Sequence, residues 1–269
     1  MKRHTLSWIF TLLLVFVLGV IGRPMLMPTS AVAAPSQQGI LPLDFYLLVN
    51  QPGPLWLARI NLSDVFLAYI DLSGANLQEA TLKRSNLTGA NLSNAHLWKT
   101  NLSHADLTGA NLSFSVLNYR DLSDLKLNSA TLIEIDLSNT NLNNADLSYA
   151  NLMDANLSGS NLNYANLSNA ALSFVNIQAG DLSGANLSYV DLRRADLRDA
   201  NLSSTLFFGS NLTGSNFTGA NFSDADLRNV NLTNTVLVDV DLTGASYNLS
   251  TIWPDDFDST KSGAKLVDN

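Results

Sequence analysis

A large apolar residue occupies every fifth position from Leu62 to Ile252, and this period constrains the fold more than any other feature. The series contains 39 positions, of which 33 are Leu. The other six are Ile177, Phe207, Phe217, Phe222, Tyr247 and Ile252. A fixed period sustained over most of a chain indicates one structural unit repeated many times.

Neither a straight helix nor a straight strand can bury such a series. Residues five apart in an α-helix are offset by about 140°, so the leucines would spiral around the whole helix surface. Side chains alternate along a strand, so leucines five apart would point to opposite faces of a sheet. The chain can keep all of them inside only if it bends once in every five residues. This predicts a coil of short, stacked, extended segments.

The four residues between successive leucines support such a coil. The residue two places before the leucine, here called the small position, is mostly small or β-branched and shares the inward face. The residue directly before the leucine, the ladder position, is Asn in 18 repeats and Asp in 10. The residue directly after it, the outer position, is usually Ser or Thr. The next residue, the corner position, is often Gly, Asn or Asp, which tolerate a tight turn.

Segments such as Ala90-Asn91-Leu92-Ser93-Asn94 and Ala105-Asp106-Leu107-Thr108-Gly109 resemble the A-[D/N]-L-x-x unit of pentapeptide repeat proteins. In that family four units form one square coil. The resemblance therefore implies an all-β fold, a right-handed quadrilateral parallel β-helix with nearly ten coils. Residues 20 apart would be vertical neighbours. Asp64 would then lie over Arg84, and Glu79 over Lys99.

The N-terminus has the layout of a secretory signal peptide. Basic residues at positions 2–4 precede an apolar run over 6–21, and Ala31-Val32-Ala33 forms a small-x-small cleavage site before Ala34. A helix of about 16 residues spans roughly 24 Å, less than the roughly 30 Å hydrocarbon core of a bilayer. We expect residues 1–33 to be a signal peptide that exports the protein to the periplasm, or to the thylakoid lumen of a cyanobacterium. A retained N-terminal membrane anchor is the alternative.

The remaining segments divide into a linker and N-terminal cap over 34–56, the repeats over 57–252 and a C-terminal cap and tail over 253–269. Trp253 and Phe257 are large enough to cover an open coil, and Pro254 prevents further strand pairing.

The polar residues repeat along the chain instead of converging, which argues against an enzyme. There is no Cys, and two of the three histidines, His96 and His104, are expected on different sides of the coil. We therefore expect no catalytic residue, no cofactor and no metal site.

The formal net charge of −8 raises an alternative, because some members of the family present an acidic rod to a type II topoisomerase in place of DNA. A DNA mimic needs dense charge of one sign. Here the acidic residues alternate with bases, and the cluster of Arg193, Arg194 and Arg198 is interleaved with Asp. An acidic DNA-mimicking inhibitor of a nucleic-acid enzyme is thus the second hypothesis, and direct nucleic-acid binding is not expected.

The first hypothesis is a non-catalytic exported scaffold, a structural or protein-interaction module with a protein partner. Its candidate interaction surface consists of Phe114, Tyr119, Arg120, Ile133 and Met153. Ile133 and Met153 are 20 apart at outer positions. Arg120 falls on an inward small position, where an unpaired guanidinium is costly. Either a bulge lets Arg120 reach water, or it bonds Thr100 and Thr140.

Overall fold

The computed structural model describes residues 54–268, which form a compact unit separate from residues 1–53. The predicted signal peptide and nearly all of the predicted linker lie outside the described residues. Within the described range, no helix is long and apolar enough to cross a membrane.

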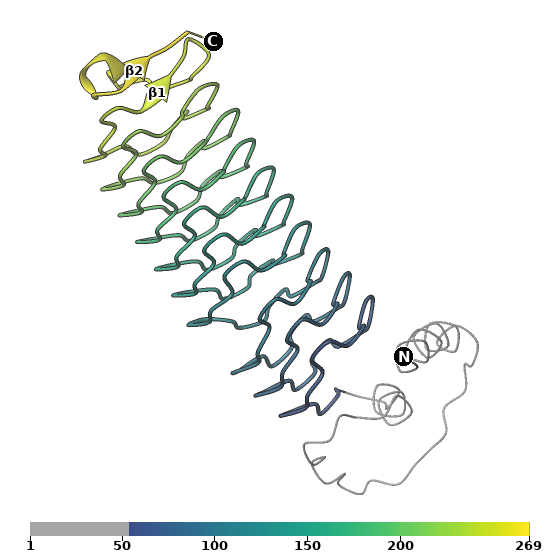
Figure 1. Cartoon of the computed structure of the whole chain (residues 1–269). Coiled ribbons are helices and arrows are strands. Elements are labelled where there is room, and N and C mark those ends of the chain that lie inside the picture. The colour runs from purple at the N-terminus through teal and green to yellow at the C-terminus, as the bar shows by residue number, and fades with distance from the viewer. Residues whose placement is uncertain (1–53, 269) are drawn as a thin grey trace, which may run out of the picture. The chain divides into compact units, whose positions relative to one another are not determined.

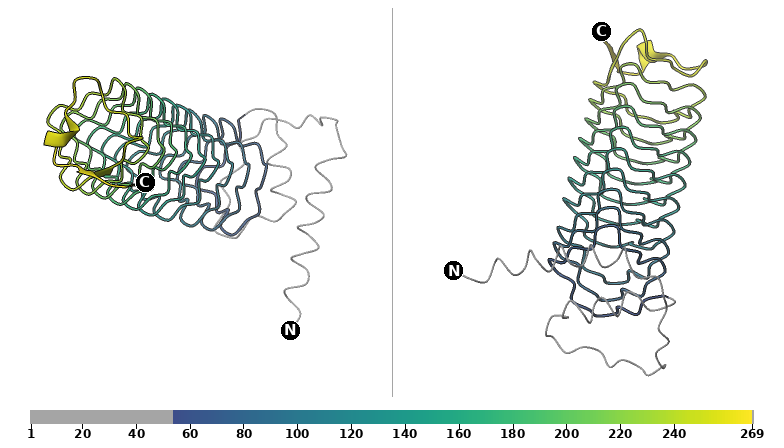
Figure 2. Two further views of the ribbon diagram at one scale, coloured as in Figure 1. Left: turned by 90° about the horizontal axis from the view of Figure 1, so that it is seen from above. Right: turned by 90° about the vertical axis from the view of Figure 1, so that its right-hand side faces the viewer.

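The described residues form the right-handed, four-sided parallel β-helix that the sequence predicts (Figure 1). Most ladder residues pair in parallel with the residue 20 positions later, as Asn141 does with Asn161 and Asn161 with Asp181. One coil therefore contains four repeats, and Figure 2 shows these coils stacked one on another. The prediction that residues 20 apart are vertical neighbours is confirmed.

The leucines at the core position fill the interior of the coil. Those from Leu72 to Leu117 are at most 2% exposed, and the alanines at the small position beside them are buried as well. Each buried leucine stabilises the fold by about 1.5–3 kcal/mol before chain entropy is subtracted. Phe207, Phe217 and Phe222 also point inward, with ring centroids 5.0 Å apart for Phe217 and Phe222.

The bend between sides is made at the corner position, which has positive φ from Arg59 to Gly244. This holds for glycines such as Gly184 (φ +67°) and equally for large residues such as Tyr164 (φ +56°). The left-handed conformation costs an L-residue about 1 kcal/mol or more. The stacking of the coils must therefore compensate this strain at every occupied corner.

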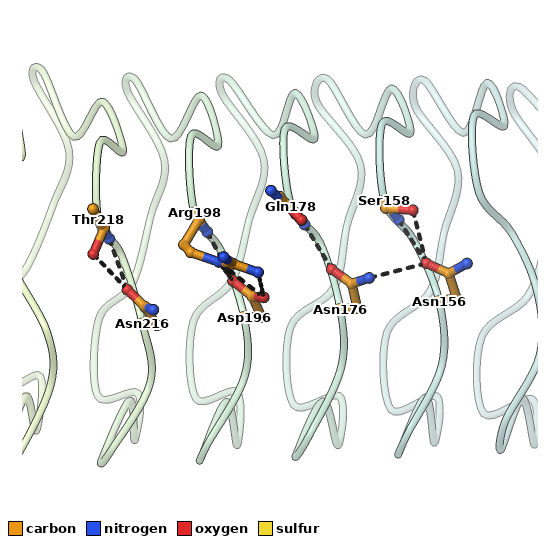
Figure 3. Close-up of polar contacts among 8 residues, drawn as sticks. All are labelled: Asn156, Ser158, Asn176, Gln178, Asp196, Arg198, Asn216 and Thr218. Carbon is orange, nitrogen blue, oxygen red and sulfur yellow. Dashed lines mark hydrogen bonds and ion pairs between the residues drawn. The ribbon is translucent and has the colours of Figure 1, made fainter.

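Side-chain amides link the ladder positions of successive coils (Figure 3). Asn156 Oδ1 accepts a bond from the backbone N–H of Ser158 (3.2 Å) and another from Asn176 Nδ2 (3.4 Å). Asn156 Nδ2 in turn donates to Asp136 Oδ1 at 3.2 Å. An asparagine can continue such a chain in both directions because it has a donor and an acceptor, whereas an ionised aspartate can only accept.

Each run of side-chain bonds therefore begins with an aspartate on its N-terminal side. The runs that the structure shows are Asp71–Asn91–Asn111, Asp121–Asn141–Asn161, Asp136–Asn156–Asn176, Asp146–Asn166–Asn186 and Asp181–Asn201–Asn221. Where an arginine occupies the outer position, it binds the ladder aspartate of its own repeat, in place of an asparagine from the next coil. Arg198 binds both carboxylate oxygens of Asp196, and Asn216 lies beyond that pair (Figure 3).

The C-terminal end closes with a change of register. Asn231 pairs with Ile252, 21 residues later instead of 20, and Ile252 is 53% exposed. The expectation that Ile252 continues the core series is wrong. The extra residue accommodates Asn248, which is buried and whose Oδ1 accepts from the N–H of Asn229 at 3.1 Å. The Asn229 N–H therefore donates to a side-chain oxygen, whereas most other corner N–H groups donate to a backbone carbonyl.

Beyond this point the chain folds back over the last coil. Strand β1 (Ser246–Tyr247) pairs in parallel with β2 (Lys265–Leu266), and a single 3-10 turn, η1 (Ser259–Lys261), lies between them. Trp253 meets the Tyr247 ring edge-on, with centroids 5.4 Å apart, and stacks on Phe257 at 4.9 Å. These three rings form one aromatic cluster at the C-terminal end of the described chain.

Asn156→Asp should destabilise the fold by about 1–3 kcal/mol, because it removes the donor to Asp136 and places two carboxylates side by side. The matched control is Asn216→Asp, since Asn216 donates no side-chain bond to Asp196 and Arg198 already balances the charge of that aspartate. That control should change stability by less than about 0.5 kcal/mol. Chemical denaturation at neutral pH measures both variants. Equal losses in the two would show that the side-chain ladder contributes nothing.

Candidate interaction surface

The described residues carry their large exposed side chains at outer, corner and ladder positions of the coil. Of the five predicted surface residues, the structure brings three to one edge. Ile133 and Met153 are vertical neighbours at outer positions, and Glu134, beside Ile133, donates its N–H to the Met153 carbonyl at 3.1 Å. Phe114 occupies the corner one coil earlier, 51% exposed, and donates its N–H to the Ile133 carbonyl at 3.0 Å.

The other two predicted residues lie one side further around the coil. Tyr119 is a corner residue and 72% exposed, whereas Arg120 is half-buried with its Nε enclosed and without a hydrogen-bond partner. The five residues therefore do not form one continuous surface.

Arg120 adopts neither of the two arrangements that the sequence suggested. Thr100 Oγ1 donates to the Leu77 carbonyl at 2.7 Å, and Thr140 Oγ1 donates to the Leu117 carbonyl at 3.1 Å, so neither hydroxyl bonds Arg120. The strand of Arg120 does not bulge either, because Asp121 still pairs with Asn141 at the usual spacing of 20. The backbone instead loses its pairing with the preceding coil, as described below.

A second surface, which the sequence analysis missed, lies further toward the C-terminus. We call it the aromatic patch, and it consists of Tyr189, Leu206, Phe208 and Arg228. The rings of Tyr189 and Phe208 meet edge-on with centroids 5.6 Å apart, and the Arg228 guanidinium lies over the Phe208 ring at 5.7 Å. The signal was present as three consecutive large apolar residues over 206–208, where the repeat requires one.

The aromatic patch is held rigidly by the coil. Leu206 occupies a ladder position and is 45% exposed, because its inward neighbour Phe207 takes the core position. The Tyr189 ring covers the corner of the next coil, where a Cβ on Gly209 would come within 2.6 Å of Tyr189 Cε1. The Tyr189 ring can lie over this corner only because residue 209 is glycine and has no Cβ.

Several charged residues on the surface form ion pairs with each other. Arg84 binds Asp64 (2.6 Å), as the stacking predicted, whereas Glu79 binds Arg59 (2.9 Å) and not Lys99. Arg59 and Lys99 each lie 20 residues from Glu79, on opposite sides of it in the stack. The arginine offers the better hydrogen-bonding geometry for a carboxylate. Lys99 instead places its Nζ 4.3 Å from the centre of the Trp98 ring.

The basic cluster is paired too. Arg193 binds Asp191 at 2.7 Å and Arg198 binds Asp196 at 2.6 Å, while Arg194 lies over the Phe174 ring. Hydrogen bonds from these two paired arginines lower the pKa of Asp191 and of Asp196. Two of the three arginines are therefore paired with the aspartates that interleave them in the sequence.

Three further aspartates of the ladder have lowered pKa values, and each is followed two residues later by a Ser or Thr. Hydrogen bonds from Ser73, Ser123 and Thr243 lower the pKa of Asp71, Asp121 and Asp241 below the ordinary 3.8. These bonds favour the ionised carboxylate because each donor points at an oxygen that carries the charge.

Across the described residues, no group of three or more His, Asp or Glu side chains is arranged to hold a metal ion. His96 pairs in the ladder with Asn76, and His104 occupies a corner with φ +59°. A hollow of about 200 Å³ at the C-terminal end is lined by Leu249, Leu266, Val267 and Asp268.

Stability should be nearly constant from neutral pH down to about pH 4 and should fall below it. A carboxylate whose folded pKa is depressed stabilises the fold above its unfolded pKa, and this contribution is lost as the pH falls through the folded value. Denaturation midpoints measured between pH 7 and pH 2 test this. A midpoint that stays level or rises over the acidic part of that range would contradict it.

Comparison with known proteins identifies the architecture. A family model described as pentapeptide repeats matches residues 57–118 and 121–246 in overlapping segments. Between residues 57 and 246 the family model leaves only residues 119 and 120 unmatched, and Arg120 is the residue that occupies a small position there. A search of curated proteins found no match.

Several solved structures are similar. One is HetL, a pentapeptide repeat protein involved in heterocyst differentiation regulation in the cyanobacterium Nostoc sp. strain PCC 7120. It is 30% identical, with a TM-score of 0.64 over 78% of this chain and 97% of HetL. Another Nostoc pentapeptide repeat protein, alr5209, is 33% identical over 38% of this chain and 84% of its own, with a TM-score of 0.38.

A pentapeptide repeat protein of the Arabidopsis thaliana thylakoid lumen is 27% identical, covering 42% of this chain and 68% of its own, with a TM-score of 0.29. The family model covers well over half of the chain and agrees with the four-sided coil of the structure. The chain therefore belongs to the pentapeptide repeat family.

Proposed function

We propose that this protein is an exported, non-catalytic scaffold that binds a protein partner through the aromatic patch. The observation that carries the proposal is the exposure of Tyr189 and Leu206 beside the half-buried ring of Phe208, which meets the Tyr189 ring edge-on. Isolated apolar residues on a surface need no explanation, but neighbouring ones with fixed rings are typical of interfaces.

The chemistry of the remaining polar groups supports a scaffold over an enzyme. The ladder asparagines and aspartates hold backbone amides and each other, and the surface arginines hold aspartates. Their hydrogen-bonding capacity is thus used in maintaining the coil, whereas catalysis requires polar groups that converge on a substrate.

The charge arrangement gives less support to DNA mimicry. Asp64, Asp191, Asp196 and Asp226 each bind an arginine, and Asp106 faces Lys126 at 3.6 Å. Such pairs break a surface into neighbouring charges of opposite sign. A mimic of the phosphate backbone needs uninterrupted negative charge.

Export rests on the N-terminal sequence, with its basic start, apolar run and small residues before Ala34. Intact-mass measurement of protein purified from its native host should give Ala34 as the first residue. Recovery of a chain that still begins at Met1 or Lys2 in the membrane fraction would replace export of a free protein with N-terminal anchoring.

Replacement of the aromatic patch by residues usual for its positions tests the interface without disturbing the coil. The triple variant Tyr189→Asn, Leu206→Asn and Phe208→Ser should melt within a few degrees of the parent, since Asn and Ser are common at the corner, ladder and outer positions. Recovery of the partner by crosslinking and quantitative mass spectrometry should fall about tenfold or more.

Tyr164→Asn is the control, because Tyr164 is 69% exposed at another corner and also covers a glycine, Gly184. It should leave partner recovery unchanged. Undiminished recovery by the triple variant would show that the partner binds elsewhere on the coil.

A further inference from the structure

The backbone ladder opens between two segments, 95–104 and 115–124, which we call the seam. In the regular ladder, the first segment would donate to the next coil through the N–H groups of Leu97, Lys99, Leu102 and His104. The second segment would donate to the previous coil through the N–H groups of Val116 and Asp121. None of these makes a hydrogen bond within the described part of the chain. Figure 1 shows a wider step between the coils at this place.

The seam opens on two sides of the square and stays closed on the other two. Asp106 still pairs with Lys126, and Asn111 with Thr131. The second segment also keeps its bonds to the coil that follows, with Tyr119 N–H to the Ser138 carbonyl at 3.0 Å. The coils on either side of the seam therefore remain joined along two sides of the square only.

Arg120 lies at the corner where the two open sides meet. The small position normally holds an alanine or a small hydroxyl residue, and a guanidinium cannot fit there at the usual coil spacing. Among the arginines in the described range, Arg120 alone binds neither a carboxylate nor an aromatic ring, and its Nε is enclosed without a partner. A charge held in this way normally requires a counter-ion.

The ladder carboxylates of these coils bond other groups and not Arg120. Asp121 Oδ1 accepts from Ser123 N–H (3.2 Å), Ser123 Oγ (2.8 Å) and Asn141 Nδ2 (2.9 Å). Asp136 accepts from Asn118 Nδ2 at 3.0 Å and from Asn156 Nδ2 at 3.2 Å. On the preceding coil Lys99 forms no ion pair and adds a second positive charge at the neighbouring corner.

We propose that the seam is an oxyanion-binding site, in which Arg120 and the unbonded amides bind a carboxylate or a phosphate group. Arginine presents N–H donors in a planar fork that suits both groups, and backbone N–H groups supply further donors. Lys99 draws negative charge to the opening. This site is separate from the aromatic patch and does not depend on a protein bound there.

Amide hydrogen exchange of the full-length chain tests the site directly. Without added anion, peptides covering 95–104 and 115–124 should exchange much faster than those of neighbouring coils, because their amides lack partners. Inorganic phosphate should slow this exchange saturably, about tenfold at saturation, whereas sodium chloride at equal ionic strength should not. Acetate in place of phosphate shows whether a carboxylate suffices.

Arg120→Ala should abolish the phosphate effect, and its seam amides should exchange slowly with or without phosphate because the ladder can close. Arg120→Gln keeps most of the bulk of the side chain without its charge. If this bulk is what holds the two coils apart, the seam amides of Arg120→Gln should still exchange fast, and phosphate should not slow them. Arg194→Ala is the matched control, since Arg194 also lacks a carboxylate partner, and it should respond like the parent.

Three results would overturn the proposal. Slow exchange in the parent without anion would mean that the ladder is closed. An equal effect of chloride and phosphate would mean screening instead of binding. A phosphate response retained in both Arg120→Ala and Arg120→Gln would place the anion away from Arg120.

Discussion

The fold depends on one constraint, which is that every coil must match the coil above and below it at all four sides. A single coil cannot bury its leucines alone, because its two open edges and its ends are exposed. Stacking covers the leucines, pairs the backbone amides and offsets the strain of the positive-φ corners at the same time. A residue that fits its own coil but not the neighbouring one therefore disturbs several interactions together, as Arg120 does.

The ladder shows why Asn and Asp are not equivalent at the same position. Both accept a bond from the backbone two residues later, so either can support the bend. Only Asn can also donate to the preceding coil, as Asn161 does to Asn141 at 3.1 Å. Most ladder aspartates therefore stand where a run begins or where an arginine at the outer position takes over, as at Asp196.

Much of this could be predicted from the sequence, because a period of five leaves the chain few alternatives. The inward leucines, the tight corners and the misfit of Arg120 follow from position in the repeat, whereas the Asp64–Arg84 stack follows from the four repeats per coil that the family resemblance implies. The period did not predict how the structure would respond to a misfit. At Arg120 two coils separate, and at Asn248 one residue is added so that a side-chain oxygen replaces a carbonyl. The aromatic patch was missed because Leu206 and Phe208 flank a normal core residue and become a surface only through stacking.

The corners have a consequence for how such a protein can change over time. Their backbone conformation is imposed by the coil and is the same for Gly184, Tyr164 and Arg194. The side chain at a corner thus contributes little to whether the coil forms, and it projects to the outside. Mutation can exchange one corner side chain for another at small cost to folding. New binding surfaces can therefore evolve on an unchanged scaffold, with selection acting on the outside of the rod while the inside stays the same.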